Sequence, residues 1–88
     1  MYSVLTKLRR VEETQTGRQL VVYVKFRNNR DGIVDVHAKT NKNGPVISVS
    51  RSGDGFAVHY NATSDWMQCA NEDQVYSWVL QKLTELTQ

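Results

Sequence analysis

One ten-residue stretch, 19–28, constrains the fold of this chain more than any other. Its sequence is QLVVYVKFRN, in which every even-numbered residue before the last is large and apolar and the odd-numbered residues end in Lys25 and Arg27. Alternation with a period of two is typical of a strand that buries one face and exposes the other to solvent. We therefore take this stretch as the centre of an antiparallel sheet that has one apolar face and one open face.

The remaining patterns predict an α+β fold: a five-stranded antiparallel β-meander with one C-terminal α-helix packed on one face. The strands are expected at about 2–12, 19–28, 33–39, 46–51 and 56–62, and the helix at about 72–87. Asn71 is a favourable N-cap for that helix, with Gln74 three residues later in a capping-box arrangement. The 88 residues are expected to form a single domain, 1–88.

Turn chemistry predicts the register of the sheet. A three-residue loop, 30–32, places Phe26 opposite Val36, and the following hairpins place Val36 opposite Val49 and Val49 opposite Val58. Segment 64–70 is expected to be a connection that crosses the apolar face, where Trp66 is favoured to be buried. For Trp78, burial and exposure are equally compatible with the helical pattern.

The charge is unevenly distributed along the chain. Residues 1–54 hold ten Lys and Arg against five Asp and Glu, a net of +5, whereas residues 55–88 hold one against four, a net of −3. The expected location is cytoplasmic, because no apolar run approaches membrane-spanning length, no signal-peptide pattern is visible, and the single Cys69 has no cysteine partner. No membrane partner and no cofactor are expected.

Basic and planar side chains on the predicted open face indicate a small non-enzymatic binding module that contacts nucleic acid, because phosphates attract positive charge and bases stack on planar groups. The candidate nucleic-acid-binding residues are Lys7, Arg9, Tyr23, Lys25, His37, Lys39, Ser48 and His59.

A protein-protein interaction module is the alternative. The strand at 56–62 is predicted to be an unprotected sheet edge, which can receive a strand from a partner protein or from a second copy in a homodimer. The candidate interface residues are Trp78, Trp66, Ala57, His59 and Asn61. The layout of strands followed by a helix resembles, in architecture alone, small single-stranded-DNA and RNA binders and small viral or accessory inhibitor proteins.

One row of the open face contains residue types that catalysis or metal binding could use. The predicted register places Ser48 between His37 and His59, but no oxyanion hole or glycine elbow accompanies these residues. The two histidines would lie two strand spacings apart, about 9.6 Å, with only Asp35 as a further candidate ligand. We therefore expect neither an enzyme nor a metal site.

Overall fold

The computed structural model describes residues 1–15, 21–39 and 44–86. The elements follow one another in the order α1 (Tyr2–Gln15), β1 (Val22–Phe26), a 3₁₀ turn (Arg27–Asn29), β2 (Ile33–Ala38), β3 (Ile47–Ser52), β4 (Gly55–Tyr60), β5 (Asp65–Cys69) and α2 (Glu72–Leu86). The strands form one antiparallel sheet in the order β1-β2-β3-β4-β5. The prediction of an α+β fold with a five-stranded antiparallel sheet and a C-terminal helix is confirmed.

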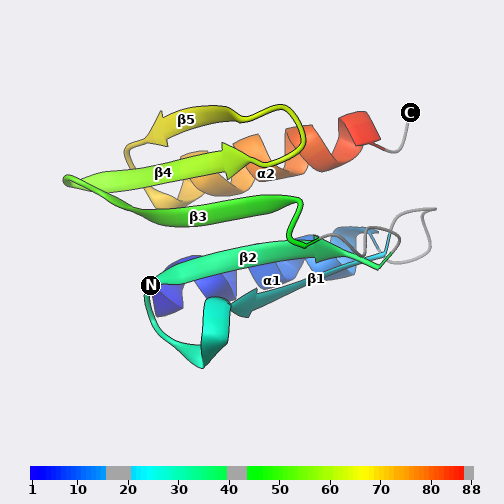
Figure 1. The fold of residues 1–88 in the computed structure, drawn as a ribbon, viewed down its shortest axis with the longest axis horizontal. Coiled ribbons are helices and arrows are strands. Elements are labelled where there is room, and N and C mark those ends of the chain that lie inside the picture. The colour runs from blue at the N-terminus through cyan, green and yellow to red at the C-terminus, as the bar shows by residue number, and fades with distance from the viewer. Residues whose placement is uncertain (16–20, 40–43, 87–88) are drawn as a thin grey trace.

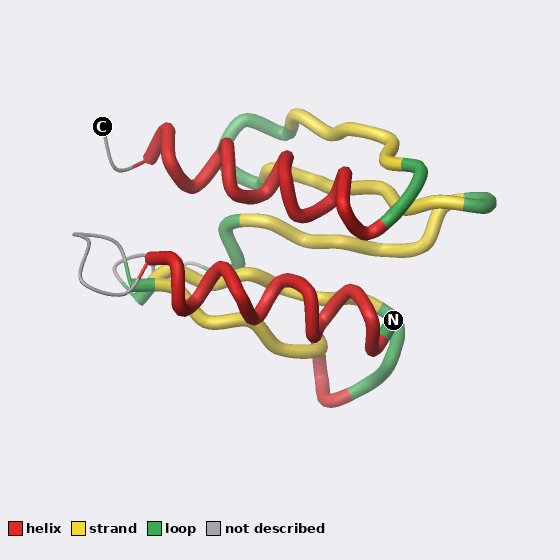
Figure 2. The backbone as a smooth tube through the Cα atoms, turned by 180° about the vertical axis from the view of Figure 1, so that it is seen from behind, coloured by secondary structure: helices red, strands yellow, loops and turns green. Residues whose placement is uncertain are grey.

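Both helices cover the same face of the sheet. Figure 1 shows α1 behind β1 and β2, and α2 behind β4 and β5, and the view from behind shows the two helices side by side (Figure 2). The core lies between the two layers. Its fully buried side chains come from one stripe of each helix and one face of the sheet: Val4, Leu8, Val11, Val34, Val36, Ile47, Val49, Val58, Val75, Val79 and Leu83.

Residues 2–12, expected to be a strand, lie in helix α1, so the fold has two helices rather than one. Four buried residues, Val4, Leu5, Leu8 and Val11, explain the difference. A strand would turn Val4 and Leu5 to opposite faces, whereas positions i, i+1, i+4 and i+7 share one side of a helix. Helix formation therefore buries all four residues together.

The segment expected to be a connection, 64–70, contains strand β5. Trp66 in this strand is 63% exposed and Met67 is 46% exposed, so the prediction that Trp66 is buried is wrong. The strand predicted at 56–62, now β4, pairs with β5 and is not a sheet edge. The edges are β5 and β1, so the most clearly patterned strand lies at the side of the sheet and not at its centre.

Two of the three predicted registers are wrong by two residues. Phe26 pairs with Val34 rather than Val36, and Val36 pairs with Ile47 rather than Val49. In the first hairpin the reason is a longer connection, in which the 3₁₀ turn places Asn28 and Asn29 at positive φ of 55° and 58°. A shift of two residues keeps every side chain on its predicted face. The register that places Val49 opposite Val58 is confirmed.

Helix α2 begins as its sequence predicts. The side chain of Asn71 accepts a hydrogen bond from the Gln74 backbone N–H at 3.0 Å, and the Gln74 side chain accepts one from the Ala70 N–H at 2.8 Å. The first bond satisfies a backbone donor that helix geometry leaves free, and the second links the residue before the cap to the first turn of α2. Lys7 of α1 then forms an ion pair with Asp73 at 2.6 Å, which joins the two helices at the start of α2.

Glycine is required at position 55, where the first residue of β4 lies against the last residue of β5. A Cβ atom there would fall well inside contact distance of the Cys69 backbone oxygen. We expect Gly55→Ala to lower the free energy of unfolding by about 2 kcal/mol, because a backbone strand must move to accept the methyl group. The matched control is Gly32→Ala, where a Cβ meets nothing within 4 Å. Equal urea-unfolding midpoints for the two variants would contradict this account.

Candidate binding site on the open face of the sheet

One row of side chains crosses all five strands on the open face, the sheet face turned away from the helices. The observed register places Lys25 opposite Asp35, Asp35 opposite Ser48, Ser48 opposite His59 and His59 opposite Trp66. The predicted row had His37 beside Ser48. The two-residue shift replaces this histidine with an aspartate, which changes the chemistry of the row.

Asp35 is the centre of a polar network. It is only 3% exposed and is the one buried charged residue among the described side chains. Arg27 donates to both carboxylate oxygens, from Nε to Oδ2 and from Nη2 to Oδ1, each at 2.9 Å. The Ser48 hydroxyl donates to Oδ1 at 3.0 Å. The hydrogen bond to Asp35 raises the pKa of Arg27, as expected for a bidentate charge-assisted pair.

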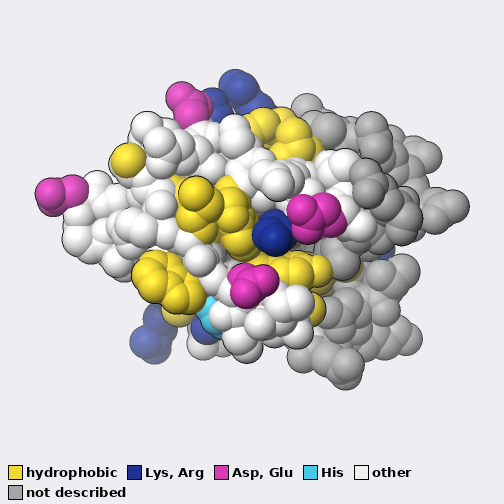
Figure 3. All heavy atoms as spheres, turned by 90° about the horizontal axis from the view of Figure 1, so that it is seen from above, with side chains coloured by type: hydrophobic (Ala, Val, Ile, Leu, Met, Phe, Trp, Pro, Cys, Tyr) yellow, Lys and Arg dark blue, Asp and Glu magenta, His cyan; other side chains and the backbone are white. Residues whose placement is uncertain are grey.

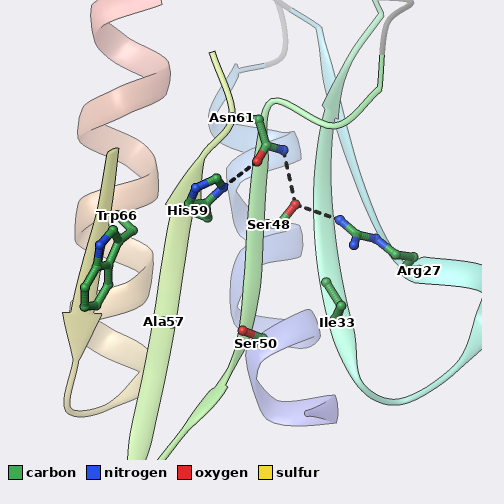
Figure 4. A pocket seen from close by; sticks show the side chains of 8 residues that line it. All are labelled: Arg27, Ile33, Ser48, Ser50, Ala57, His59, Asn61 and Trp66. Atoms are coloured by element: carbon green, nitrogen blue, oxygen red, sulfur yellow. Dashed lines mark hydrogen bonds between the residues drawn. The ribbon is translucent and has the colours of Figure 1, made fainter. Parts of the chain in front are cut away.

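The network continues from Ser48 to His59. Arg27 Nη2 and Asn61 Nδ2 both donate to Ser48 Oγ, at 3.0 and 3.2 Å. Asn61 Oδ1 lies 2.7 Å from His59 Nδ1, as Figure 4 shows. Because an amide oxygen only accepts, Nδ1 carries the proton, and Nε2 of a neutral His59 is an acceptor. Ser48 thus bonds Asn61 rather than either histidine, and its proton and both lone pairs are engaged.

A pocket of about 370 Å³ lies beside this network and is called the Trp66 pocket below. Figure 4 shows Trp66 on one side, Arg27 and Ile33 on the other, and Ala57 and Ser50 on the strands between them. Small residues on the two middle strands leave this space above the sheet. The complete lining is Arg27, Ile33, Ser48, Ser50, Ala57, His59, Asn61 and Trp66.

A second hollow of about 210 Å³ adjoins the Trp66 pocket at the loop between β1 and β2. It shares Arg27 and Ile33 with that pocket and adds Asn28, Arg30 and Gly32. Arg27 and Ile33 therefore border both hollows, one of which opens toward Trp66 on β5 and the other toward Arg30 in the β1–β2 loop.

The β1–β2 part of the open face carries an aromatic stack. The rings of Tyr23 and His37 are parallel within 6°, with centroids 4.9 Å apart, and Lys25 Nζ lies 5.9 Å from the centre of the Tyr23 ring. His37 Nε2 is buried and has no hydrogen-bond partner among the described atoms. Burial and, secondarily, the charge of Lys25 lower the pKa of His37.

The open face brings together most of the residues predicted to bind nucleic acid. Tyr23, Lys25, His37 and Lys39 lie on its β1–β2 part, and Ser48 and His59 line the Trp66 pocket. Lys7 and Arg9 do not belong to this face, because residues 2–12 form α1 on the other side of the sheet. The Lys7 side chain instead faces α2, where its Nζ lies 5.9 Å from the centre of the Tyr76 ring.

The residues predicted to form a protein interface divide into two places. Trp66, Ala57, His59 and Asn61 line the same pocket, although the edge strand that was expected to unite them is not an edge. Trp78 lies apart on α2, where it is half-buried against the core with Lys82 Nζ 5.3 Å from its ring centre.

Arg27 was not among the predicted site residues, and Trp66 was expected to be buried rather than to lie on the open face. Arg27 forms an ion pair with Asp35, although the residue directly opposite Asp35 in β1 is Lys25. Ile33 and Ser50, which complete the pocket, were also missed. One signal was available for Trp66: it lies an odd number of residues before the buried Cys69, so in a strand the two side chains occupy opposite faces.

Comparison of the chain with known protein families, with curated proteins and with solved structures gave no match. Within the described residues, neither helix is long and apolar enough to cross a membrane. The same part of the chain contains no group of three or more His, Cys, Asp or Glu side chains that could hold a metal ion. The function must therefore be argued from the open face itself.

The ion pair between Arg27 and Asp35 should contribute measurably to stability. We expect Arg27→Ala to lower the free energy of unfolding by about 2 kcal/mol, because it leaves a buried carboxylate with fewer donors. Lys25→Ala is the matched control: Lys25 is a nearby cation on the same face of the sheet, exposed and without a bond to Asp35, and its loss should cost less than about 0.5 kcal/mol. Chemical denaturation measures both variants. Equal losses would show that the network is not a stabilising element.

The titration of His37 tests the electrostatics of the open face. Its lowered pKa means that the unfolded chain binds more protons as pH falls below about 6.5, so the contribution of His37 to stability is present above that pH and lost below it. Lys25→Ala should raise the pKa of His37, because it removes a repelling charge. An NMR titration of the imidazole resonances measures the change, and an unaltered or lowered pKa would contradict the assignment.

Proposed function

We propose that this protein is a small non-enzymatic module that binds single-stranded nucleic acid across the open face of its sheet. The observation that carries the proposal is the Trp66 pocket: an exposed indole faces a hollow with small residues on its floor and Arg27 on its far side. Aromatic platforms beside cationic groups are what proteins use to hold unpaired bases and their phosphates.

Shape supports a base as the group that enters the pocket. Ala57 and Ser50 are short enough to leave room for a planar ring against the Trp66 indole. At one end of the hollow, His59 Nε2 is an acceptor that a base amino group can reach, since Nδ1 is occupied by Asn61. Stacking on one aromatic side chain contributes about 1–3 kcal/mol per base and tolerates any sequence.

Charge supports a polyanion as the ligand. Among the described residues, the open face and the β1–β2 loop carry Lys25, Arg27, Arg30 and Lys39 against Asp31 and Asp35, four positive charges and two negative, a net of +2. The β1–β2 part adds the Tyr23–His37 stack as a second planar surface. A strand with unstacked bases can lie over both planar surfaces, whereas a duplex keeps its bases inside.

A binding role rather than a catalytic one agrees with the state of Ser48. Its hydroxyl donates to Asp35 and accepts from Arg27 and Asn61, so the oxygen has no free lone pair with which to attack a substrate. The proposed location is cytoplasmic, a reducing compartment that suits the free, buried Cys69 thiol.

A protein partner is the second candidate function, and the exposure of Trp66 is the observation that favours it. An exposed tryptophan beside a pocket is a frequent energetic centre of protein interfaces. Salt distinguishes the two functions, because nucleic-acid binding releases counterions and weakens steeply as salt rises, whereas an interface centred on an apolar side chain tolerates salt.

Replacement of Trp66 tests the proposal. We expect Trp66→Ala to weaken binding of a labelled, mixed-sequence single strand by about 5- to 150-fold, the equivalent of losing one stacked base. Fluorescence anisotropy at low and physiological salt measures the affinity. The matched control is Trp78→Phe, which alters the other tryptophan on the helical side of the sheet and should leave the affinity unchanged.

Two results would contradict the proposal. One is absence of binding by the wild-type protein at low salt. The other is an equal effect of the two tryptophan substitutions, which would mean that the pocket is not the contact.

A further inference from the structure

The outer edge of β5 carries backbone groups that no described residue satisfies. The Asn61 N–H donates to the Val46 carbonyl, so odd-numbered residues of β4 bond to β3 and even-numbered ones bond to β5. The partners of those even residues in β5 are Asp65, Met67 and Cys69. By the same alternation, Trp66 and Gln68 direct their N–H and C=O groups away from the sheet.

The opposite edge of the sheet is protected. The outward N–H of Val24 in β1 donates to the Glu12 carboxylate of α1 at 2.6 Å, and α1 packs along this strand. An inserted carboxylate and a covering helix block the addition of another strand there. Strand β5, with the sequence DWMQC, has no lysine or proline to do the same. Of the two edges, β5 is the one open to pairing.

We propose that two copies of this chain associate through β5, in antiparallel register about a two-fold axis at Met67. This register places Trp66 opposite Gln68 of the second copy and Gln68 opposite Trp66 of the second copy. All four outward groups on each strand then find partners, which makes four hydrogen bonds across the axis. A second copy presents the same two outward residues at the same spacing, so the two-fold arrangement leaves no outward group of either strand unpaired.

The side chains of β5 are compatible with this self-pairing. Asp65 is the only charged residue in the strand, and the register places it opposite Cys69 of the second copy, so no like charges meet. Met67, 46% exposed on the helical side of the sheet, meets its own equivalent at the axis. Figure 3 looks down onto this side of the molecule and shows hydrophobic side chains in several patches with acidic and basic groups between them.

The association extends the sheet to ten strands and places the two open faces side by side. The two copies of Trp66 then lie on neighbouring strands, so both Trp66 pockets open on one continuous surface. This inference concerns assembly and goes beyond the proposed function: a monomeric protein could still bind nucleic acid, and a dimer could fail to do so.

A charge exchange at the axis tests the inference. Sedimentation of the wild-type chain from micromolar to millimolar concentration should show a reversible monomer–dimer equilibrium. Met67→Lys and Met67→Glu should each weaken self-association by about tenfold or more, because like charges then face each other at the axis. An equimolar mixture of the two variants should restore the dimer. Met67→Leu is the control and should associate as the wild type does.

The outcomes separate the alternatives. A wild-type chain that stays monomeric at every concentration overturns the inference, as does a dimer that neither charged variant weakens. Failure of the mixture to recover association would place the contact away from a two-fold axis at Met67. Circular dichroism checks that the variants are folded, which the exposure of Met67 leads us to expect.

Discussion

Burial of a single face of the sheet is the constraint on which the rest of this structure depends. Each strand from β1 to β4 turns its valines toward the layer formed by α1 and α2, which lie side by side on that face. The opposite face is therefore released from packing and can carry charge, rings and polar groups. Because strand side chains alternate strictly, the core also fixes which residues reach the open face and in what order.

The polar network turns that face into a defined surface. The buried Asp35 accepts two hydrogen bonds from Arg27 and one from Ser48. Asn61 in turn bonds both Ser48 and His59. These hydrogen bonds restrict the side chains of Arg27 and His59, so two walls of the Trp66 pocket are positioned before any ligand arrives. Preorganisation of this kind reduces the entropy that binding must otherwise overcome.

The sequence was sufficient to predict the fold class, four of the strands, helix α2 with its cap, and the residues on each face of those strands. The predicted face of each residue stayed correct even where the register was displaced by two residues, because the period of a strand is two.

Three features of the structure were not predicted from the sequence. The spacing of Val4, Leu5, Leu8 and Val11 is helical, but alternation between Lys7, Leu8 and Arg9 imitates a strand. The left-handed Asn28 and Asn29 lengthen a turn that Asp31 and Gly32 seemed to define, and β5 has no alternating pattern at all. Because the β1–β2 turn contains Arg27 and β5 contains Trp66, the errors in these two segments hid the pocket that both residues line.

The most direct test of the central claim is a ¹⁵N chemical-shift titration with a short mixed-sequence single strand, at low and at physiological salt. The account predicts that the Trp66 indole N–H and the backbone amides of Ser50, Ala57 and His59 shift at low salt, and that these shifts fade as salt rises. Shifts confined to α1 and α2, or none on the open face even at low salt, would contradict it and leave the basic charge of this face without a role in binding nucleic acid.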